Sequence, residues 1–413
     1  NPTRPDLALT PPSSTHRRCR LLAVCLAGGL AAPAVADTAP APEVDTGPRW
    51  ALTLSVGLGD DDNLSLLPVA PVRGRYLLAY PLLTATWAGG GYTTTLQARA
   101  EWLRHDGHPE FDRTNSELGA GGVAALGEHA ATAWRVVLQD WHDPVGTGAL
   151  ARPDDEPDHF VAAAAGIVFR ADALDGPARL EAELNASRKR YQNHRAVTVA
   201  GDLQTRGLVL RAVRRAAPGA TQWSGELRAL SADYDYRPLA LTHEDQRLMF
   251  GGQVDPVAGA PWSWRLQGGW QRLGFARLRP DRTAMAWEAQ GQWSPRPVTQ
   301  LEVGGRRQLM VLPGDLADAV DERMLRLAWT EVWAAHWSTT MAASQTRLDY
   351  RYGGFADGEA RIETVRTLDL ALRRDLGDGQ AMVLSAATLR RDTDDPTLRY
   401  RRRVLRLMFE TRW

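Results

Sequence analysis

Cysteine is almost absent from this sequence, and its two copies, Cys19 and Cys25, both lie near the N-terminus. The chain from residue 37 onward therefore has no thiol, which excludes a disulfide scaffold, a cysteine-ligated metal site and a cysteine nucleophile in that part. The chain also has no net charge, because 49 basic residues balance 49 acidic ones. A surface that binds nucleic acid needs a basic excess, so no nucleic-acid partner is expected.

Long hydrophobic runs are also missing, with one exception near the N-terminus. Several arginines precede an apolar run at residues 21–30, and Ala34-Val35-Ala36 follows it. This is the order of a secretory signal peptide that is cleaved after the last alanine. We expect residues 1–36 to be a signal peptide that includes an extension from an over-called start. Lipoprotein modification at Cys25 is an alternative, but Val24 stands where a small residue is wanted.

The remainder of the chain has no run long enough for a membrane-spanning helix. Residues 37–48 are rich in Pro, Ala, Thr and acidic residues, which predicts a flexible linker. From 49 to 413, strand-length segments alternate with two kinds of break. Some breaks are short and rich in Gly or Pro, such as Gly377-Asp378-Gly379, whereas others are often longer and acidic, such as residues 143–157. Short turns on one side and longer loops on the other are typical of bacterial barrels, and about eighteen strands fit this division.

The predicted strands show a period of two. Between residues 178 and 187, Leu180 and Leu184 alternate with Arg179 and Glu181. Soluble sheets alternate as well, but charged residues at mid-strand fit a water-filled interior, and Ala, Gly and Leu on the other face fit lipid. We therefore predict an all-β, transmembrane, antiparallel up-and-down β-barrel in the outer membrane of a Gram-negative bacterium, with both termini in the periplasm.

Tryptophan is abundant and unevenly placed. Ten of the 15 tryptophans fall within about five residues of a predicted short turn or a chain end. They are Trp50, Trp87, Trp134, Trp223, Trp262, Trp264, Trp293, Trp333, Trp337 and Trp413. Because tryptophan prefers the headgroup level of a bilayer, this pattern predicts a ring at one membrane interface.

The last strand has the form of an assembly signal. Leu405, Leu407, Phe409, Thr411 and Trp413 share one face and end on an aromatic residue. Such a strand resembles the signal that the barrel-assembly machinery recognises. The expected partners are therefore that machinery during biogenesis, together with outer-membrane lipid and lipopolysaccharide.

Polar residues on the opposite faces of the strands are the candidates for lining the lumen. They are Arg99, Glu101, Arg179, Glu181, Arg265, Gln267, Glu288, Gln290, Glu302, Arg306, Arg326, Asp369 and Arg373. Both signs of charge are present, so no strong ion selectivity follows from the set. Hydrogen-bonding side chains of this kind could also suit a sugar chain, but for any single residue we expect pairing with a neighbour across the wall.

Catalytic and metal sites are weakly indicated. His105, Asp106 and His108, and likewise Trp141-His142-Asp143, could serve a hydrolase at the barrel rim, yet no Ser stands in a nucleophile elbow. Solvated loop histidines are expected instead, and no enzyme activity. The acidic clusters lack the spacing of a calcium loop, so we expect solvated loops without a metal or cofactor; divalent cations bridging them to lipopolysaccharide are a milder alternative. These clusters are Asp60-Asp61-Asp62-Asn63, Asp154-Asp155-Glu156 and the group Asp392, Asp394 and Asp395.

Three short motifs carry a family resemblance. Gly57-Leu58-Gly59-Asp60-Asp61-Asp62-Asn63 resembles the opening of a family of outer-membrane β-barrel porins, although that family usually has an aromatic residue where Asp60 stands. Tyr80-Pro81 and Arg188-Lys189-Arg190-Tyr191-Gln192-Asn193 are similar to its later motifs. Members often accompany exopolysaccharide synthesis and export machinery, so the resemblance implies a wide polar lumen, no catalytic residue and an export system as partner.

A second family shares this opening, namely the barrels of surface lipoprotein assembly modifiers. Those proteins usually carry helical repeats ahead of a barrel with fewer strands, where this chain has only the linker. The sequence therefore favours a passive conduit for polysaccharide or small hydrophilic solutes. A translocation or assembly factor for surface lipoproteins is the alternative, and a rim hydrolase that uses His105 or His142 is a third hypothesis.

Overall fold

The computed structural model describes residues 47–143, 156–172, 177–214, 216–217, 219–255, 261–276, 278–312, 317–334, 336–351 and 360–413. The expected signal peptide, most of the linker and the acidic pair Asp154-Asp155 lie outside them. The strands are β1 (Arg49–Asp61), β2 (Gly74–Gly89), β3 (Tyr92–His105), β4 (Arg113–Ala125), β5 (Ala130–Asp143), β6 (Asp158–Asp172), β7 (Ala178–Tyr191), β8 (Leu203–Arg214), β9 (Gln222–Tyr234), β10 (His243–Val254), β11 (Trp262–Phe275), β12 (Arg282–Arg296), β13 (Thr299–Met310), β14 (Ala319–Ala334), β15 (Trp337–Arg351), β16 (Arg361–Gly377), β17 (Gln380–Thr393) and β18 (Tyr400–Arg412). The short helices are η1 (Pro109–Phe111), α1 (Arg195–Thr198), η2 (Val199–Gly201), η3 (Arg237–Leu239) and η4 (Pro396–Leu398). No helix in the described ranges is long and apolar enough to cross a membrane.

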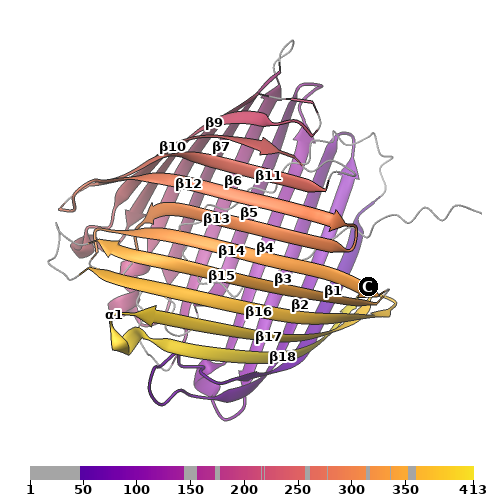
Figure 1. The fold of residues 1–413 in the computed structure, drawn as a ribbon, viewed down its shortest axis with the longest axis vertical. Coiled ribbons are helices and arrows are strands. Elements are labelled where there is room, and N and C mark those ends of the chain that lie inside the picture. Colours follow the sequence, from indigo (N-terminus) through magenta and orange to yellow (C-terminus); the bar gives the residue numbers. More distant parts are fainter. Residues whose placement is uncertain are drawn as a thin grey trace, which may run out of the picture.

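The strands form one closed antiparallel sheet of eighteen (Figure 1). Each strand pairs with its neighbours in the sequence, and β1 also pairs with β18, from Thr53 opposite Arg412 to Asp61 opposite Val404. Closure leaves no free edge, so the backbone polar groups of every strand find partners inside the sheet, as crossing a bilayer requires. The predicted fold class and strand number are confirmed.

The two ends of the barrel differ in the length of their connections. At the short-turn end, Gly90 and Gly91 join β2 to β3, and Asp378 and Gly379 join β16 to β17. The three glycines have φ angles of 54°, 87° and 76°, a left-handed conformation that glycine adopts without strain. Connections at the opposite, long-loop end are mostly longer, such as residues 62–73. β1 begins and β18 ends at the short-turn end, as the spacing of the turns predicts.

The outward face of the barrel carries a continuous band of large apolar side chains. Leu184, Leu208, Leu210 and Leu227 are all exposed, and the register places Leu184 opposite Leu208 and Leu210 opposite Leu227. An apolar band of this extent around a closed sheet is typical of contact with lipid. The chain is therefore a transmembrane barrel of the Gram-negative outer membrane, as predicted.

Tryptophans mark one edge of this band. The ten that were predicted to lie there are on outward positions near the short-turn end, and Trp50, Trp223, Trp333 and Trp413 are each more than half exposed. Trp50 and Trp87 meet edge to face, with ring centroids 6.1 Å apart. Broad rings at this level suit the headgroup region of a bilayer.

Packed loops cover part of the barrel at its long-loop end. Leu241, in the connection between β9 and β10, is buried against inward residues of neighbouring strands, including Tyr234 and Leu273. Arg279, in the next loop, donates hydrogen bonds to the carbonyl oxygens of Leu239, at 3.0 Å, and Ala317. These bonds join three successive loops into one packed group.

Candidate functional site: the barrel lumen and its seam

The register shows which side chains point into the barrel. On β7, exposed Leu180 and Leu184 point outward, so the alternate residues Arg179 and Glu181 point inward. The same alternation, carried around the ladder of paired strands, places every predicted lumen residue on the inward side. They are Arg99, Glu101, Arg179, Glu181, Arg265, Gln267, Glu288, Gln290, Glu302, Arg306, Arg326, Asp369 and Arg373.

Most of these inward charges are paired along the wall. Arg99 Nη2 lies 2.6 Å from Glu117 Oε2, and Glu101 accepts a hydrogen bond from Arg113 Nε at 3.1 Å. Arg373 contacts both Glu410 and Asp375. Pairing with a neighbour, which the sequence led us to expect for any single residue, is therefore observed for these arginines and glutamates.

A longer chain of alternating charges crosses β6 to β9. Arg170 and Arg211 both donate to Glu181, at 3.1 and 2.9 Å, and Arg211 also pairs with Glu226 at 2.5 Å. Arg228 adds a second guanidinium to Glu226. Such a network fixes each long side chain against the wall and keeps it out of the centre of the lumen.

Burial within these pairs is unequal. The Arg99 side chain is 43% exposed and Glu117 only 7%; for Arg306 and Glu322 the values are 34% and 2%. The Arg179–Asp172 pair has the opposite order, at 9% and 23%. The longer guanidinium reaches past the shorter carboxylate in most of the inward pairs. The wall therefore presents more positive than negative charge to the lumen, although the inward residues carry both signs.

Amides complete the polar wall. Gln253 accepts a bond from Arg265 at 3.1 Å, and Gln267 donates to Ser224 at 3.3 Å. Gln290 donates to Glu288 at 3.3 Å. Asp369, on β16, interacts electrostatically with Arg326 on β14 and Arg406 on β18, each two strands away along the wall. Gln300 likewise donates a hydrogen bond to a glutamate of the wall, Glu302, at 2.8 Å.

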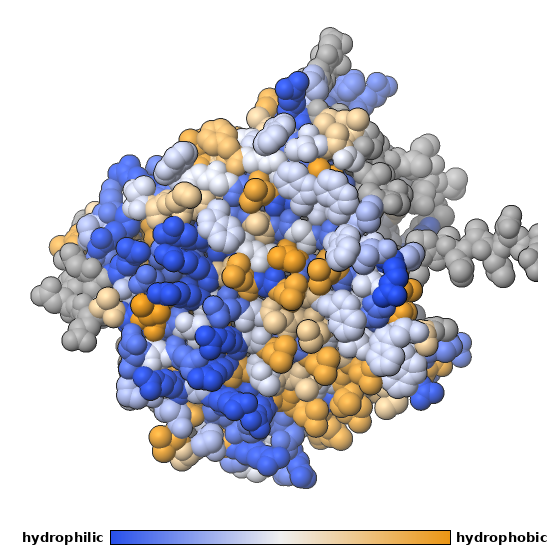
Figure 2. Space-filling view, in the orientation of Figure 1, coloured by the Kyte–Doolittle hydropathy of each residue, from blue (hydrophilic) through white to orange (hydrophobic). Residues whose placement is uncertain are grey.

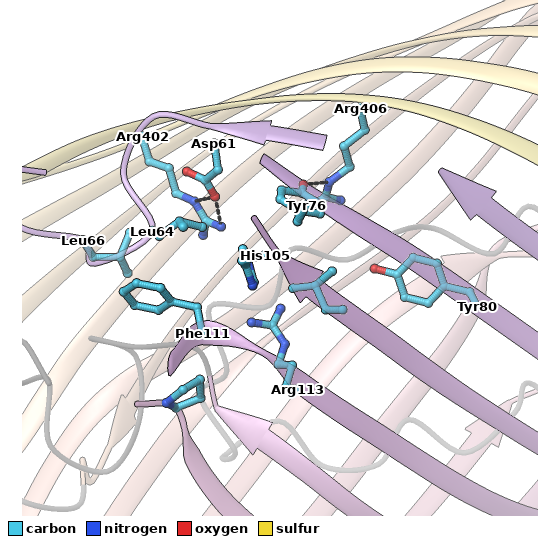
Figure 3. A pocket seen from close by; sticks show the side chains of 12 residues that line it. Asp61, Leu64, Leu66, Tyr76, Tyr80, His105, Phe111, Arg113, Arg402 and Arg406 are labelled. Atoms are coloured by element: carbon cyan, nitrogen blue, oxygen red, sulfur yellow. Dashed lines mark hydrogen bonds and ion pairs between the residues drawn. The ribbon is translucent and has the colours of Figure 1, made fainter. Parts of the chain in front are cut away.

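The seam between β1 and β18 forms an enclosed polar site (Figure 3). Arg402 donates two hydrogen bonds to Asp61 Oδ2, the one from Nε at 2.7 Å, and the Asp61 side chain is 0% exposed. Next to this pair, Arg406 Nε donates to the Tyr76 hydroxyl at 2.8 Å. A small cavity lies between these groups, His105 and Phe111.

The acidic segment after Gly59 therefore fastens the first strand to the last. Asp62 accepts a bond from the Arg403 amide at 2.5 Å, and Asn63 donates to the Arg401 carbonyl at 2.9 Å. The expectation of a solvated acidic loop was wrong for Asp61 and Asn63, because closure of the barrel buries them. Asp60 points outward, where it pairs with the exposed Arg73 at 2.9 Å.

Glycines explain the rest of this motif. A Cβ on Gly59 would occupy the space of the Tyr76 ring, and a Cβ on Gly57 would collide with the Leu407 carbonyl of β18. Glycine at these two positions allows Tyr76 and β18 to approach β1 closely. The residues that resemble a family opening are thus the residues that close the barrel.

His105 and His142, the two histidines considered for a rim hydrolase, lie in strands. His105 is the last residue of β3, 9% exposed, and its backbone amide and ring both contact Asp112. His142 stacks on His159 with ring centroids 4.6 Å apart. The expectation of solvated loop histidines was wrong for these two, which lie in strands. Within the described ranges, no group of three or more His, Cys, Asp or Glu side chains could hold a metal ion.

Comparisons with known proteins concern the fold. No protein-family model matches the chain, and no curated protein sequence is similar to it. Among solved structures it is similar to OccAB3 of Acinetobacter baumannii, with 13% identity, a TM-score of 0.48, and coverage of 89% of this chain and 99% of that one. It is also similar to OccK7 (OpdD) of Pseudomonas aeruginosa, with 13% identity, a TM-score of 0.47, and coverage of 89% and 98%. OccK2 (OpdF) of the same species, solved with glucuronate, gives 12% identity, a TM-score of 0.46, and coverage of 88% and 98%.

Proposed function

We propose that this protein is a passive channel for small hydrophilic solutes across the outer membrane. The observation that carries the proposal is a closed eighteen-stranded barrel whose inward side is lined by charged and amide side chains. Barrels of sixteen to eighteen strands enclose an aqueous channel when loops and side chains leave the centre open. The pairing of arginines and glutamates along the wall holds these side chains at the side of that path.

The exposed guanidiniums favour anions over cations. In pairs such as Arg99–Glu117 and Arg306–Glu322 the positive group faces the lumen and the negative group lies beneath it. A solute in the channel is therefore closer to positive charge, and rings of charge of one sign select ions of the other. We infer a weak preference for anionic solutes, a sharper expectation than the mixed charges of the sequence allowed.

Uptake into liposomes tests the channel directly. Swelling of vesicles that contain the purified full chain is expected in isotonic solutions of small neutral sugars, and faster in small carboxylates. A folded barrel that admits neither solute, also after deletion of the linker at residues 37–48, contradicts the proposal. Neutral and acidic oligosaccharides in the same assay test the polysaccharide cargo that the family resemblance suggested, which remains a prediction.

The role of an assembly factor for surface lipoproteins remains the alternative proposal. It predicts that a lipoprotein client co-purifies with the barrel and that surface lipoproteins are lost when the protein is deleted. Solute flux without such a phenotype favours the channel.

A further inference from the structure

A row of arginines lies on the outward side of β16, β17 and β18, toward the long-loop end. Arg366 stands directly opposite Arg390, and Arg390 stands directly opposite Arg401. All three are exposed and share the outward face with the apolar band. Like charges directly opposite one another in a sheet are unfavourable, so this row needs a source of negative charge.

Among the residues that the structure describes, neighbouring carboxylates supply little of that charge. Asp392 contacts Arg390 at 2.8 Å and Arg366 at 3.4 Å. Two more exposed arginines, Arg347 and Arg403, flank the row on the same face. In the part of the chain that the structure describes, the side chains of Arg347, Arg401 and Arg403 have no carboxylate partner. The nearby Asp349 is engaged by Arg351.

The row lies directly at the edge of the lipid-facing band. Two residues along β16 from Arg366 is Leu368, which is 45% exposed, and two residues along β18 from Arg403 is Leu405, which is 53% exposed. Two residues span about 7 Å of a strand. Figure 2 shows the same boundary, with hydrophilic surface over the ends of these strands away from the C-terminus and hydrophobic surface nearer to it.

We propose that these five arginines form a binding site for the phosphates of lipopolysaccharide. An amphiphile fits this surface, because its acyl chains can lie against Leu368 and Leu405 while its phosphates reach the guanidiniums above them. Arginine binds phosphate through paired hydrogen bonds, and the negative charge of the bound phosphate relieves the repulsion among the arginines of the row. The long-loop end then faces the cell exterior, as is usual for bacterial barrels.

This site differs from cation bridging at acidic loops. Bridging needs Mg²⁺ or Ca²⁺ between carboxylates and phosphates, whereas guanidiniums contact phosphate directly. Binding at the arginine row therefore persists in the presence of a chelator. A lipid that lacks phosphate groups should not bind at the arginine row.

Binding of purified lipopolysaccharide to the full chain in detergent, with EDTA present, tests the site. The variant Arg366→Gln/Arg390→Gln/Arg401→Gln removes the row but keeps polar, exposed side chains, so the barrel is expected to fold, as heat modifiability on gels verifies. Each cation at an anionic lipid surface contributes about fivefold to affinity, so the triple variant should bind on the order of a hundredfold more weakly.

The matched control removes the same charge elsewhere on the outward face. Arg188, Arg190 and Arg206 are also exposed and outward, on β7 and β8, but none of them stands directly opposite another. Their replacement by Gln should change the affinity less than about threefold. Equal losses in both triple variants, an unchanged affinity in the row variant, or equal binding of dephosphorylated lipopolysaccharide by the unaltered protein would each overturn the proposal.

Discussion

Replacing Arg402 with Met leaves a carboxylate without its countercharge at the seam of the barrel. Asp61 is 0% exposed and accepts two hydrogen bonds from Arg402, one of them at 2.7 Å, besides a bond from the Asn63 amide at 3.0 Å. Only the Asn63 bond survives the substitution. Breaking a buried ion pair by removal of one partner typically costs about 3–5 kcal/mol, because the remaining charge stays desolvated.

Two further variants show whether the unpaired charge is the cause. The double variant Asp61→Ala/Arg402→Met leaves neither charge behind, so its cost should be smaller than the sum of the two single costs, by about 2 kcal/mol. Arg73→Met is the matched control, because its pair with Asp60 is exposed at 69% and 32%, and its cost should stay within about 0.5 kcal/mol.

The assay is reversible urea unfolding in phospholipid vesicles, followed by tryptophan fluorescence and by heat modifiability on gels. Free energies of unfolding are compared at equal slope of the denaturant dependence. If Arg402→Met costs no more than Arg73→Met, or if the single costs of Asp61→Ala and Arg402→Met simply add, the seam pair does not hold the barrel closed and the reasoning is refuted.

Three other predictions concern the loops, the lipid-facing band and assembly. Arg279→Ala removes the bonds to two loop carbonyls, so it should raise hydrogen exchange in the packed loops and lower their free energy of local unfolding by about 1–3 kcal/mol. Unchanged exchange would contradict the packing of these loops into one group. Leu407→Lys, in the lipid-facing band, should destabilise the barrel in vesicles by about 2–4 kcal/mol, whereas the inward Ala371→Lys, which has no charged residue directly opposite, should cost far less; equal effects would contradict the assignment of faces. Deletion of Trp413 together with Phe409→Ser should reduce assembly in cells, while refolding from urea into detergent remains intact. Normal assembly of this variant in cells would contradict the hypothesis that the last strand carries the assembly signal.

The architecture could be predicted from the sequence because its determinants are local. Glycine-rich turns such as Gly90-Gly91 recur at strand-length intervals, and the period of two in segments such as residues 178–187 separates the lumen face from the lipid face. The tryptophans needed no tertiary information either. Their distance from a turn along the sequence fixes their height in the bilayer.

The seam could not be predicted, because its partners are far apart in the chain. Asp61 and Arg402 are 341 positions apart, and only closure of the sheet brings them together. In the sequence, the acidic segment therefore looked like a solvated loop. Its one local signal was the pair Gly57 and Gly59, whose missing side chains make room for β18 and for Tyr76.

Side-chain exposure was the other quantity hidden from the sequence. A list of inward arginines and glutamates carries no information on which partner of each pair reaches the lumen. The arginine row was partly predictable from the sequence, since the period of two places Arg366 on the same face as Leu368 and Arg403 on the same face as Leu405. What the sequence lacked was the register that places Arg366, Arg390 and Arg401 opposite one another.

Electrical recording in planar bilayers under a gradient of KCl tests the central claim most directly. A polar lumen of eighteen strands predicts stepwise conductance, and its exposed guanidiniums predict a zero-current potential with the sign of chloride preference. In Arg99→Gln/Arg306→Gln that potential should move toward the cation-selective side, while Glu117 and Glu322 each keep a glutamine donor, at 2.8 and 2.7 Å, that supports the fold. Arg99→Lys/Arg306→Lys should retain the chloride preference. No conductance from the folded barrel, or a preference for potassium in the unaltered protein, would contradict the account.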